Sequence, residues 1–262
     1  MAAKKSAGST AWKIIVGILV ALLVIVLIAE FAVRWFVSSQ INDDFHETAQ
    51  AEGVQVSEDP EVSFGGTPLL WGMVSGTISQ MNMKTPSTLE VNGTEIKGQP
   101  AADVEVSDLH VQDQVAGQMR ATTTVPDEFL LATFQKNIAD QSGSENLGNM
   151  VVTDIRAVGE DNVLEIEFAG GIARLSLKPE AVDGQLRLTA ENTALFGFNL
   201  PDQASDAVSN ALQNGMEEQV VGDMRVEDVF VDSGQLRLTV AGENIPLQDV
   251  GTQFTEMQQQ AG

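Results

Sequence analysis

The pattern of hydrophobic and polar positions divides the chain near residue 37 into an apolar N-terminal segment and a long remainder of short alternating runs. Residues 14–29 are uncharged and almost entirely aliphatic. Glu30 and Arg34 follow on one helix face, where they can pair and reach toward the outer membrane surface. Counted through Val37, the helix would be about 36 Å long, enough to cross a hydrocarbon layer of roughly 30 Å. The pattern predicts a transmembrane anchor over residues 13–37.

The residues that flank the predicted anchor indicate its orientation in the membrane. The basic residues at its start are Lys4, Lys5 and Lys13. An excess of lysine marks the cytoplasmic side of a membrane helix, and tryptophans gather at both membrane surfaces, where Trp12 and Trp35 would lie. We therefore predict a cytoplasmic tail over residues 1–12. The C-terminal part is then exported, as the extracytoplasmic domain of a single-pass cell-membrane protein.

A cleaved signal peptide is the competing interpretation of the same segment. Its apolar core would exceed the usual length of about 7–15 residues. The best available cleavage site, at Val37-Ser38-Ser39, lies far from that core. An uncleaved signal-anchor is favoured, and cleavage stays the alternative.

Beyond the anchor, residues 38–52 keep helical spacing and stop at Gly53, which predicts a helix continued from the membrane. Alternating runs then predict half-buried strands. These runs are Val104–Val106, Leu164–Phe168, Leu186–Ala190, Val226–Val231 and Leu236–Val240. Turn signals separate them at Asn92-Gly93, Ala169-Gly170-Gly171, Asp183-Gly184 and Ser233-Gly234. We predict an α+β domain over residues 38–250 with an antiparallel sheet.

Two helices interrupt the predicted strands. Proline and acidic residues open one at Pro126, and it runs to about Asp140. Its apolar stripe contains Phe129, Leu130, Thr133, Phe134 and Ile138. The other runs from Pro201 to about Val221. Each is expected to dock on the sheet, and a mobile lid over an apolar cavity is the alternative. The polar tail over residues 251–262 is expected to be disordered.

One internal similarity links two predicted strands. Asp183–Asn192 resembles Gly234–Asn244, and each copy reads as a turn, a strand and a loop. Two copies are too few for a solenoid. Recurrent hairpin geometry explains them better, with an ancient duplication as the alternative.

Composition and charge narrow the classes of function. The chain has no cysteine, two histidines and a net charge of −23. Ten basic and 36 acidic residues follow position 37, so the exported part carries about 10 − 36 = −26. Such a domain is repelled by nucleic acid and by anionic head groups, so no nucleic-acid partner is expected. No catalytic motif, nucleotide fingerprint or metal-ligand spacing is present, which predicts a protein that is not an enzyme and needs no cofactor or metal.

An apolar, glycine-punctuated segment over residues 64–74 stands out in this acidic chain, and a second cluster covers residues 195–200. The first is either a turn that plugs the end of the core or an apolar rim that meets acyl chains or the membrane.

These segments resemble the LmeA-type phospholipid-binding family of actinobacterial cell envelopes. The resemblance rests on Gly65-Gly66-Thr67-Pro68-Leu69-Leu70, Ser75-Gly76-Thr77-Ile78, Leu200-Pro201 and Glu243-Asn244-Ile245-Pro246-Leu247, in that order over about residues 30–250. Thr67 departs from the pattern, because family members often have an aromatic residue beside the proline.

The resemblance implies a curved antiparallel sheet wrapped on two or three helices around an apolar cavity, in the style of tubular lipid-binding domains. It implies binding of a phospholipid or another acyl-chain lipid, in support of envelope lipid or lipoglycan synthesis. The candidate cavity residues are Phe64, Leu69, Leu70, Trp71, Phe129, Phe134, Phe196, Phe198 and Leu212. A structural ectodomain that acts through protein partners is the alternative function, and an envelope hydrolase, for which no catalytic residues stand out, is the third.

Overall fold

The computed structural model describes residues 8–195, 198–199 and 224–248. The predicted helix at 201–221, the predicted tail at 251–262, and the candidate residues Phe196 and Leu212 lie outside these ranges. Phe198 is described by its backbone alone.

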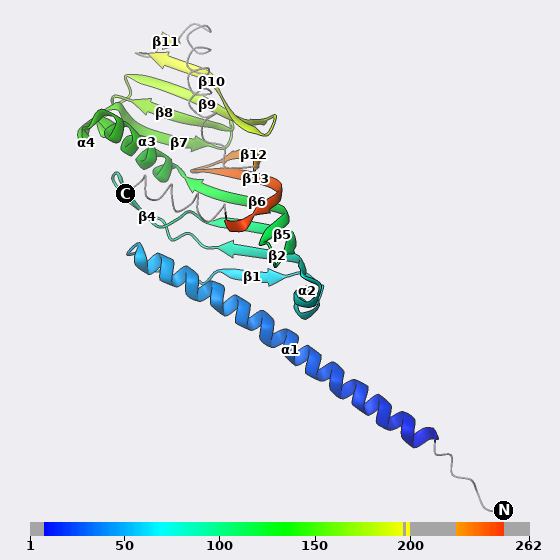
Figure 1. Ribbon diagram of the computed structural model, residues 1–262. Coiled ribbons are helices and arrows are strands. Elements are labelled where there is room, and N and C mark those ends of the chain that lie inside the picture. The colour runs from blue at the N-terminus through cyan, green and yellow to red at the C-terminus, as the bar shows by residue number, and fades with distance from the viewer. Residues whose placement is uncertain (1–7, 196–197, 200–223, 249–262) are drawn as a thin grey trace, which may run out of the picture.

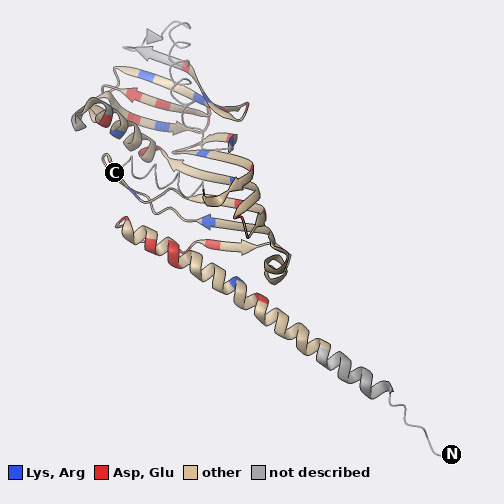
Figure 2. Cartoon of the chain, viewed as in Figure 1, with Lys and Arg blue, Asp and Glu red and all other residues tan. Residues whose placement is uncertain are grey.

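The N-terminal element is one uninterrupted helix, α1 (Gly8–Ala51). The anchor and the helix predicted after it are therefore continuous, as the spacing of apolar residues indicated. Helix α1 ends where Gly53 takes a positive φ of 75° and the Val54 N–H donates to the Ala49 carbonyl at 2.9 Å. Its C-terminal part runs beside the domain, and the rest projects away from it (Figure 1). A stretch of this projecting part carries no charged residue (Figure 2).

Within the described part of the chain, the largest sheet is antiparallel and has six strands. In chain order they are β1 (Glu61–Phe64), β2 (Thr77–Thr85), β5 (Ala102–His110), β6 (Val115–Pro126), β12 (Arg225–Asp232) and β13 (Gln235–Pro246). Their spatial order is β1-β2-β5-β6-β13-β12. A short helix, α2 (Leu69–Ser75), connects β1 to β2, and a small hairpin of β3 (Glu90–Asn92) and β4 (Glu95–Lys97) connects β2 to β5. Strand β1 lies at the edge of the sheet, beside α1 (Figure 1).

A second antiparallel sheet contains five strands in the order of their sequence. They are β7 (Val152–Val158), β8 (Val163–Phe168), β9 (Ala173–Val182), β10 (Gln185–Leu195) and β11 (Phe198–Asn199). Two helices, α3 (Asp127–Ser142) and α4 (Glu145–Val151), precede β7. The main core lies where this sheet meets α3 and the ends of β12 and β13. Its most completely buried side chains are Val152, Leu177 and Val231.

Backbone hydrogen bonds between hairpins join the two sheets. The Val226 N–H donates to the Gly184 carbonyl at 2.8 Å, and the Gly234 N–H donates to the Ala157 carbonyl at 3.0 Å. Gly184 and Gly234 are the turn glycines of the two similar sequence segments. Each segment supplies the second strand of a hairpin, which agrees with recurrent hairpin geometry as the origin of the similarity.

The predicted strands all lie within observed ones, and the α+β class with antiparallel pairing is confirmed. The strands form two large sheets, however, and not the single sheet that the sequence predicted. Helix α3 also differs from its predicted stripe, because Thr133 and Phe134 are exposed. The buried positions are Ala132, Gln135 and Ala139. Small residues let α3 approach β7 closely, and the Gln135 side chain donates to the Val152 carbonyl at 2.7 Å.

Candidate functional site

One face of the six-stranded sheet carries two rows of apolar residues. Residues paired across neighbouring strands project to the same face of a sheet. The first row crosses all six strands and consists of Val62, Met83, Val104, Ala121, Val240 and Val226. The second crosses five strands and consists of Phe64, Met81, Val106, Met119 and Gly242. We call these two rows the apolar face.

The apolar face is only partly covered. Val106 and Met119 are buried, and the other members of both rows are half-buried. The opposite face is polar because side chains alternate along each strand. One of its rows consists of Glu61, Lys84, Asp103, Thr122 and Thr239, in which the two threonine hydroxyls are hydrogen-bonded at 3.0 Å. The sheet is therefore amphipathic over its whole width.

A large open cleft of about 1310 Å³ lies beside the turn between β9 and β10, and besides polar residues of the same sheet its lining includes Met119, Val226 and Gly242 from one end of the apolar face. Arg120 and Glu227 form an ion pair of 2.5 Å across it. The charged side chains of its lining are Glu105, Arg120, Asp183, Arg225, Glu227 and Glu243. Four acids against two bases disfavour a phosphate, and the charged lining disfavours acyl chains. The apolar face therefore suits a lipid better than the cleft does.

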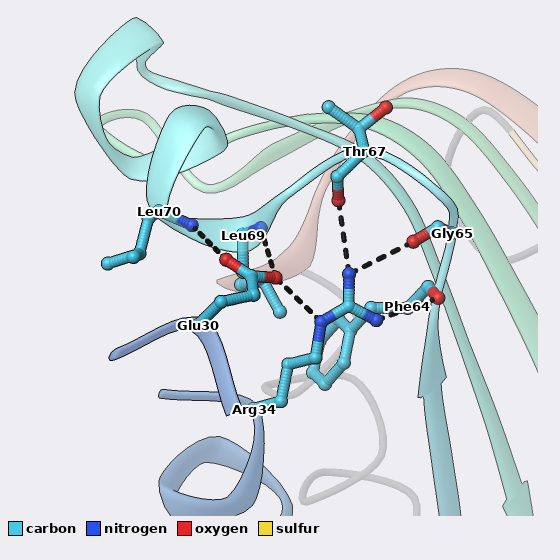
Figure 3. A network of polar contacts seen from close by, with 7 residues as sticks. All are labelled: Glu30, Arg34, Phe64, Gly65, Thr67, Leu69 and Leu70. Atoms are coloured by element: carbon cyan, nitrogen blue, oxygen red, sulfur yellow. Dashed lines mark hydrogen bonds and ion pairs between the residues drawn. The ribbon is translucent and has the colours of Figure 1, made fainter. Parts of the chain in front are cut away.

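One end of the apolar face lies against α1. The ring of Phe64 lies 5.9 Å from the guanidinium carbon of Arg34, measured to the ring centre. Arg34 donates through its Nε to Glu30 Oε1 at 2.6 Å (Figure 3). Its terminal nitrogens donate to three backbone carbonyls, those of Phe64 at 3.3 Å, Gly65 at 3.2 Å and Thr67 at 3.2 Å.

Glu30 completes the connection from the other side of the ion pair. Its two carboxylate oxygens accept the backbone N–H groups of Leu69 at 2.7 Å and Leu70 at 2.9 Å (Figure 3). These groups belong to the first turn of α2, which has no partner for them within the helix. Two charges of α1, which the sequence predicted to pair with each other, therefore also hold the segment from Phe64 to Leu70. We call this network the Glu30–Arg34 clamp.

Helix α2 resolves the two interpretations of the apolar segment. Leu69 is buried and Gly72 lies close to the backbone of β2, so this side of the helix does plug the end of the sheet. Trp71, Met73 and Val74 are 66, 57 and 83% exposed, so the other side is an apolar rim. The structure therefore bears out the plug on one side of the helix and leaves the other side as an exposed apolar surface, whose contact with acyl chains or a membrane stays a prediction.

The structure brings some of the predicted site residues together and leaves others apart. Phe64, Leu69, Leu70 and Trp71 lie at the corner where α2 meets α1 and β2. Phe129 and Phe134 lie on α3, which packs against β7 and α4. Phe198 lies in β11. Reasoning from the sequence missed the methionines and valines of the apolar face. Their alternation with polar residues was a signal for strands, but pairing between strands is invisible in a local pattern.

Among the described residues, no group of three or more histidine, cysteine or carboxylate side chains could hold a metal ion. Comparison with protein-family models gives a match to the LmeA-like phospholipid-binding family over residues 28–241. Comparisons with curated proteins and with solved structures give no match. The matched range begins within α1, before Glu30, and ends within β13, so it contains the clamp and all of the apolar face except Gly242. The chain belongs to the LmeA-like phospholipid-binding family.

Proposed function

We propose that this protein is a membrane-anchored, exported phospholipid-binding protein that holds acyl chains against the apolar face. The observation that carries the proposal is the row from Val62 to Val226, which is apolar on all six strands and half-buried. Phospholipid binding is the property of the family to which the chain belongs. Support for envelope lipid or lipoglycan synthesis is the cellular role that we infer from it.

Acyl chains would bind to this face because their methylene groups would be buried away from water. Each methylene removed from water contributes about 0.8 kcal/mol to the free energy of binding. The two rows of apolar side chains provide a surface across the sheet on which such methylenes can be buried. Methionine adapts its shape to irregular chains, and Met81, Met83 and Met119 lie side by side with valines on this face. An acidic exterior would meanwhile keep the domain from adhering unspecifically to anionic membranes.

The candidate residues from the sequence fit this proposal as two parts of one path. Phe64 begins the second apolar row, and Leu69, Leu70 and Trp71 would form the access at that end. Phe129 and Phe134 of α3 would line a continuation of it. The other candidates are Phe196 and Leu212, which lie outside the described residues, and Phe198, which is described by its backbone alone. A curved sheet wrapped on helices around this path is part of the same proposal.

We also propose that the anchor stays uncleaved, with its N-terminus in the cytoplasm and the domain outside. Among the described residues, α1 is the one helix long and apolar enough to cross a membrane. Cleavage near Val37 would remove Glu30 and Arg34, and with them the hydrogen bonds that hold the segment from Phe64 to Leu70. Intact-mass spectrometry of the protein from the membrane fraction tests this: an uncleaved N-terminus is expected.

Lipid recovery from matched variants tests the binding proposal. Met83→Glu places a carboxylate in the first apolar row, whereas Lys84→Glu places the same group at the next position of β2, on the polar face. Native mass spectrometry and lipid extraction should recover phospholipid from the unaltered protein and from Lys84→Glu, and little from Met83→Glu. Thermal unfolding shows whether each variant is folded, and Met83→Leu should keep its lipid.

Two results would contradict the proposal. Recovery of no phospholipid from the unaltered protein would favour a structural ectodomain that acts through protein partners. Full lipid recovery from a folded Met83→Glu variant would move the binding site away from the apolar face.

A further inference from the structure

We infer that α2 is itself inserted into the outer leaflet, so that the protein is attached to the bilayer at two points, α1 and the Trp71–Val74 side of α2. The partner is the boundary between head groups and acyl chains. The inference rests on the anchor that we propose, but it does not depend on lipid being bound at the apolar face.

The exposed side of α2 has the composition of a membrane surface. Trp71, Met73 and Val74 are each more than half exposed, and tryptophan favours the interfacial zone of a bilayer. The chain carries no charge from Val62 to Met83, although the exported part is strongly acidic. Helix α2 is the centre of this uncharged stretch. A patch of this kind on a protein surface marks an interaction site.

The length of the proposed membrane-spanning part of α1 puts α2 at the depth of the outer leaflet. From Lys13 to Glu30 the helix rises only about 26 Å, which is less than the roughly 30 Å hydrocarbon layer. Phe31, Trp35 and Phe36 are also exposed on α1, within the two turns that follow Glu30. The outer leaflet must therefore extend past Glu30. The clamp fixes the first turn of α2 beside Glu30, so α2 lies at that same level.

The clamp also makes this depth tolerable for two charged side chains. Glu30 and Arg34 pair with each other at 2.6 Å, so the net charge of the site is zero. The remaining donors of Arg34 reach three carbonyls, and the carboxylate of Glu30 accepts two backbone N–H groups. Hydrogen-bonded and paired charges are those that a poorly hydrated environment accepts. Insertion of α2 would set the Phe64 end of the apolar face against the leaflet.

Single cysteines in the full-length chain test the inference, because the protein has no cysteine of its own. Met73→Cys lies on α2, and the matched control is Met150→Cys, a 66% exposed methionine on the equally short helix α4. Val26→Cys, in the middle of the anchor, is the positive control. Each cysteine is labelled with an environment-sensitive NBD probe and reconstituted in phosphatidylcholine vesicles with and without doxyl-labelled phosphatidylcholine.

We expect the probes at positions 73 and 26 to emit at shorter wavelength and to lose intensity with doxyl lipid, and the probe at position 150 to do neither. A quenched probe at 26 with an unquenched probe at 73 would overturn the insertion of α2 and leave the anchor intact. Absence of quenching at both positions would overturn the anchor as well. Lipid recovery from the Met83 and Lys84 variants reports on the binding proposal separately.

Discussion

The guanidinium of Arg34 lies 5.9 Å from the centre of the Phe64 ring, so α1 touches the first residue of an apolar row that crosses five strands. A cation near an aromatic ring contributes about 0.5–2 kcal/mol, according to how much water is excluded. The contact joins α1, the proposed anchor, to the proposed binding face directly. In a tethered lipid-binding protein, it would keep one end of that face beside the membrane from which lipid is taken.

Replacement of Arg34 by methionine should destabilise the domain. The variant keeps a side chain of similar length but removes the counter-charge of Glu30 and the donors to three carbonyls. We expect a loss of about 1–3 kcal/mol in the free energy of unfolding, measured in detergent micelles by circular dichroism in urea. Arg237→Met is the control, because its ion pair with Asp232 is half-exposed and should contribute less than about 1 kcal/mol. Equal losses in both variants would contradict the role of the clamp.

Two N-terminal truncations should distinguish the contribution of the clamp to stability from that of the rest of α1. A chain that starts at residue 28 keeps Glu30 and Arg34, whereas one that starts at residue 38 loses both. In the same detergent, the shorter chain should melt lower by at least about 2 °C, since it lacks the hydrogen bonds to the segment from Phe64 to Leu70. Identical melting temperatures would show that the clamp adds nothing to stability.

Gly148→Ala should destabilise the protein even though alanine is the better helix former by about 1 kcal/mol. A Cβ at this position of α4 would lie 2.0 Å from the carbonyl oxygen of Gln135 in α3, so the two helices would have to separate. We expect a net loss of about 1–3 kcal/mol in the free energy of unfolding. Asn149→Ala, at an exposed position of the same helix, should be neutral or slightly stabilising. A stabilised Gly148→Ala variant would mean that α3 and α4 are not packed this closely.

Replacement of Asn162 by aspartate should cost little stability, whereas replacement by alanine should destabilise the protein. Its side-chain oxygen accepts the backbone N–H of the fully buried Val231 at 2.8 Å, and its φ is +54°. Aspartate offers the same acceptor and shares the tolerance of asparagine for a positive φ. We expect Asn162→Ala to cost about 1–3 kcal/mol and Asn162→Asp clearly less, as measured by thermal and urea unfolding. Similar costs for both variants would show that backbone conformation, and not the hydrogen bond, governs this position.

The sequence by itself determined α1, α3 and five of the strands of this protein, and the broad class of its fold. Its long apolar run specified one helix, and its alternating runs and turn glycines specified antiparallel hairpins, because these signals depend on neighbours within a few residues. The uneven charge followed from composition. The order of short motifs also sufficed to indicate the family, which the match over residues 28–241 confirms.

Only the tertiary structure decided which of those residues act together. Met83 faces the same side as Val104 and Val240 because of strand pairing, and pairing depends on residues far apart in the chain. The division of the strands into two sheets has the same origin. The two backbone N–H groups that donate to Glu30 likewise lie 39 and 40 positions further along the chain. A local pattern showed two opposite charges one turn apart on a helix; the fold made them a connection between α1 and the sheet domain.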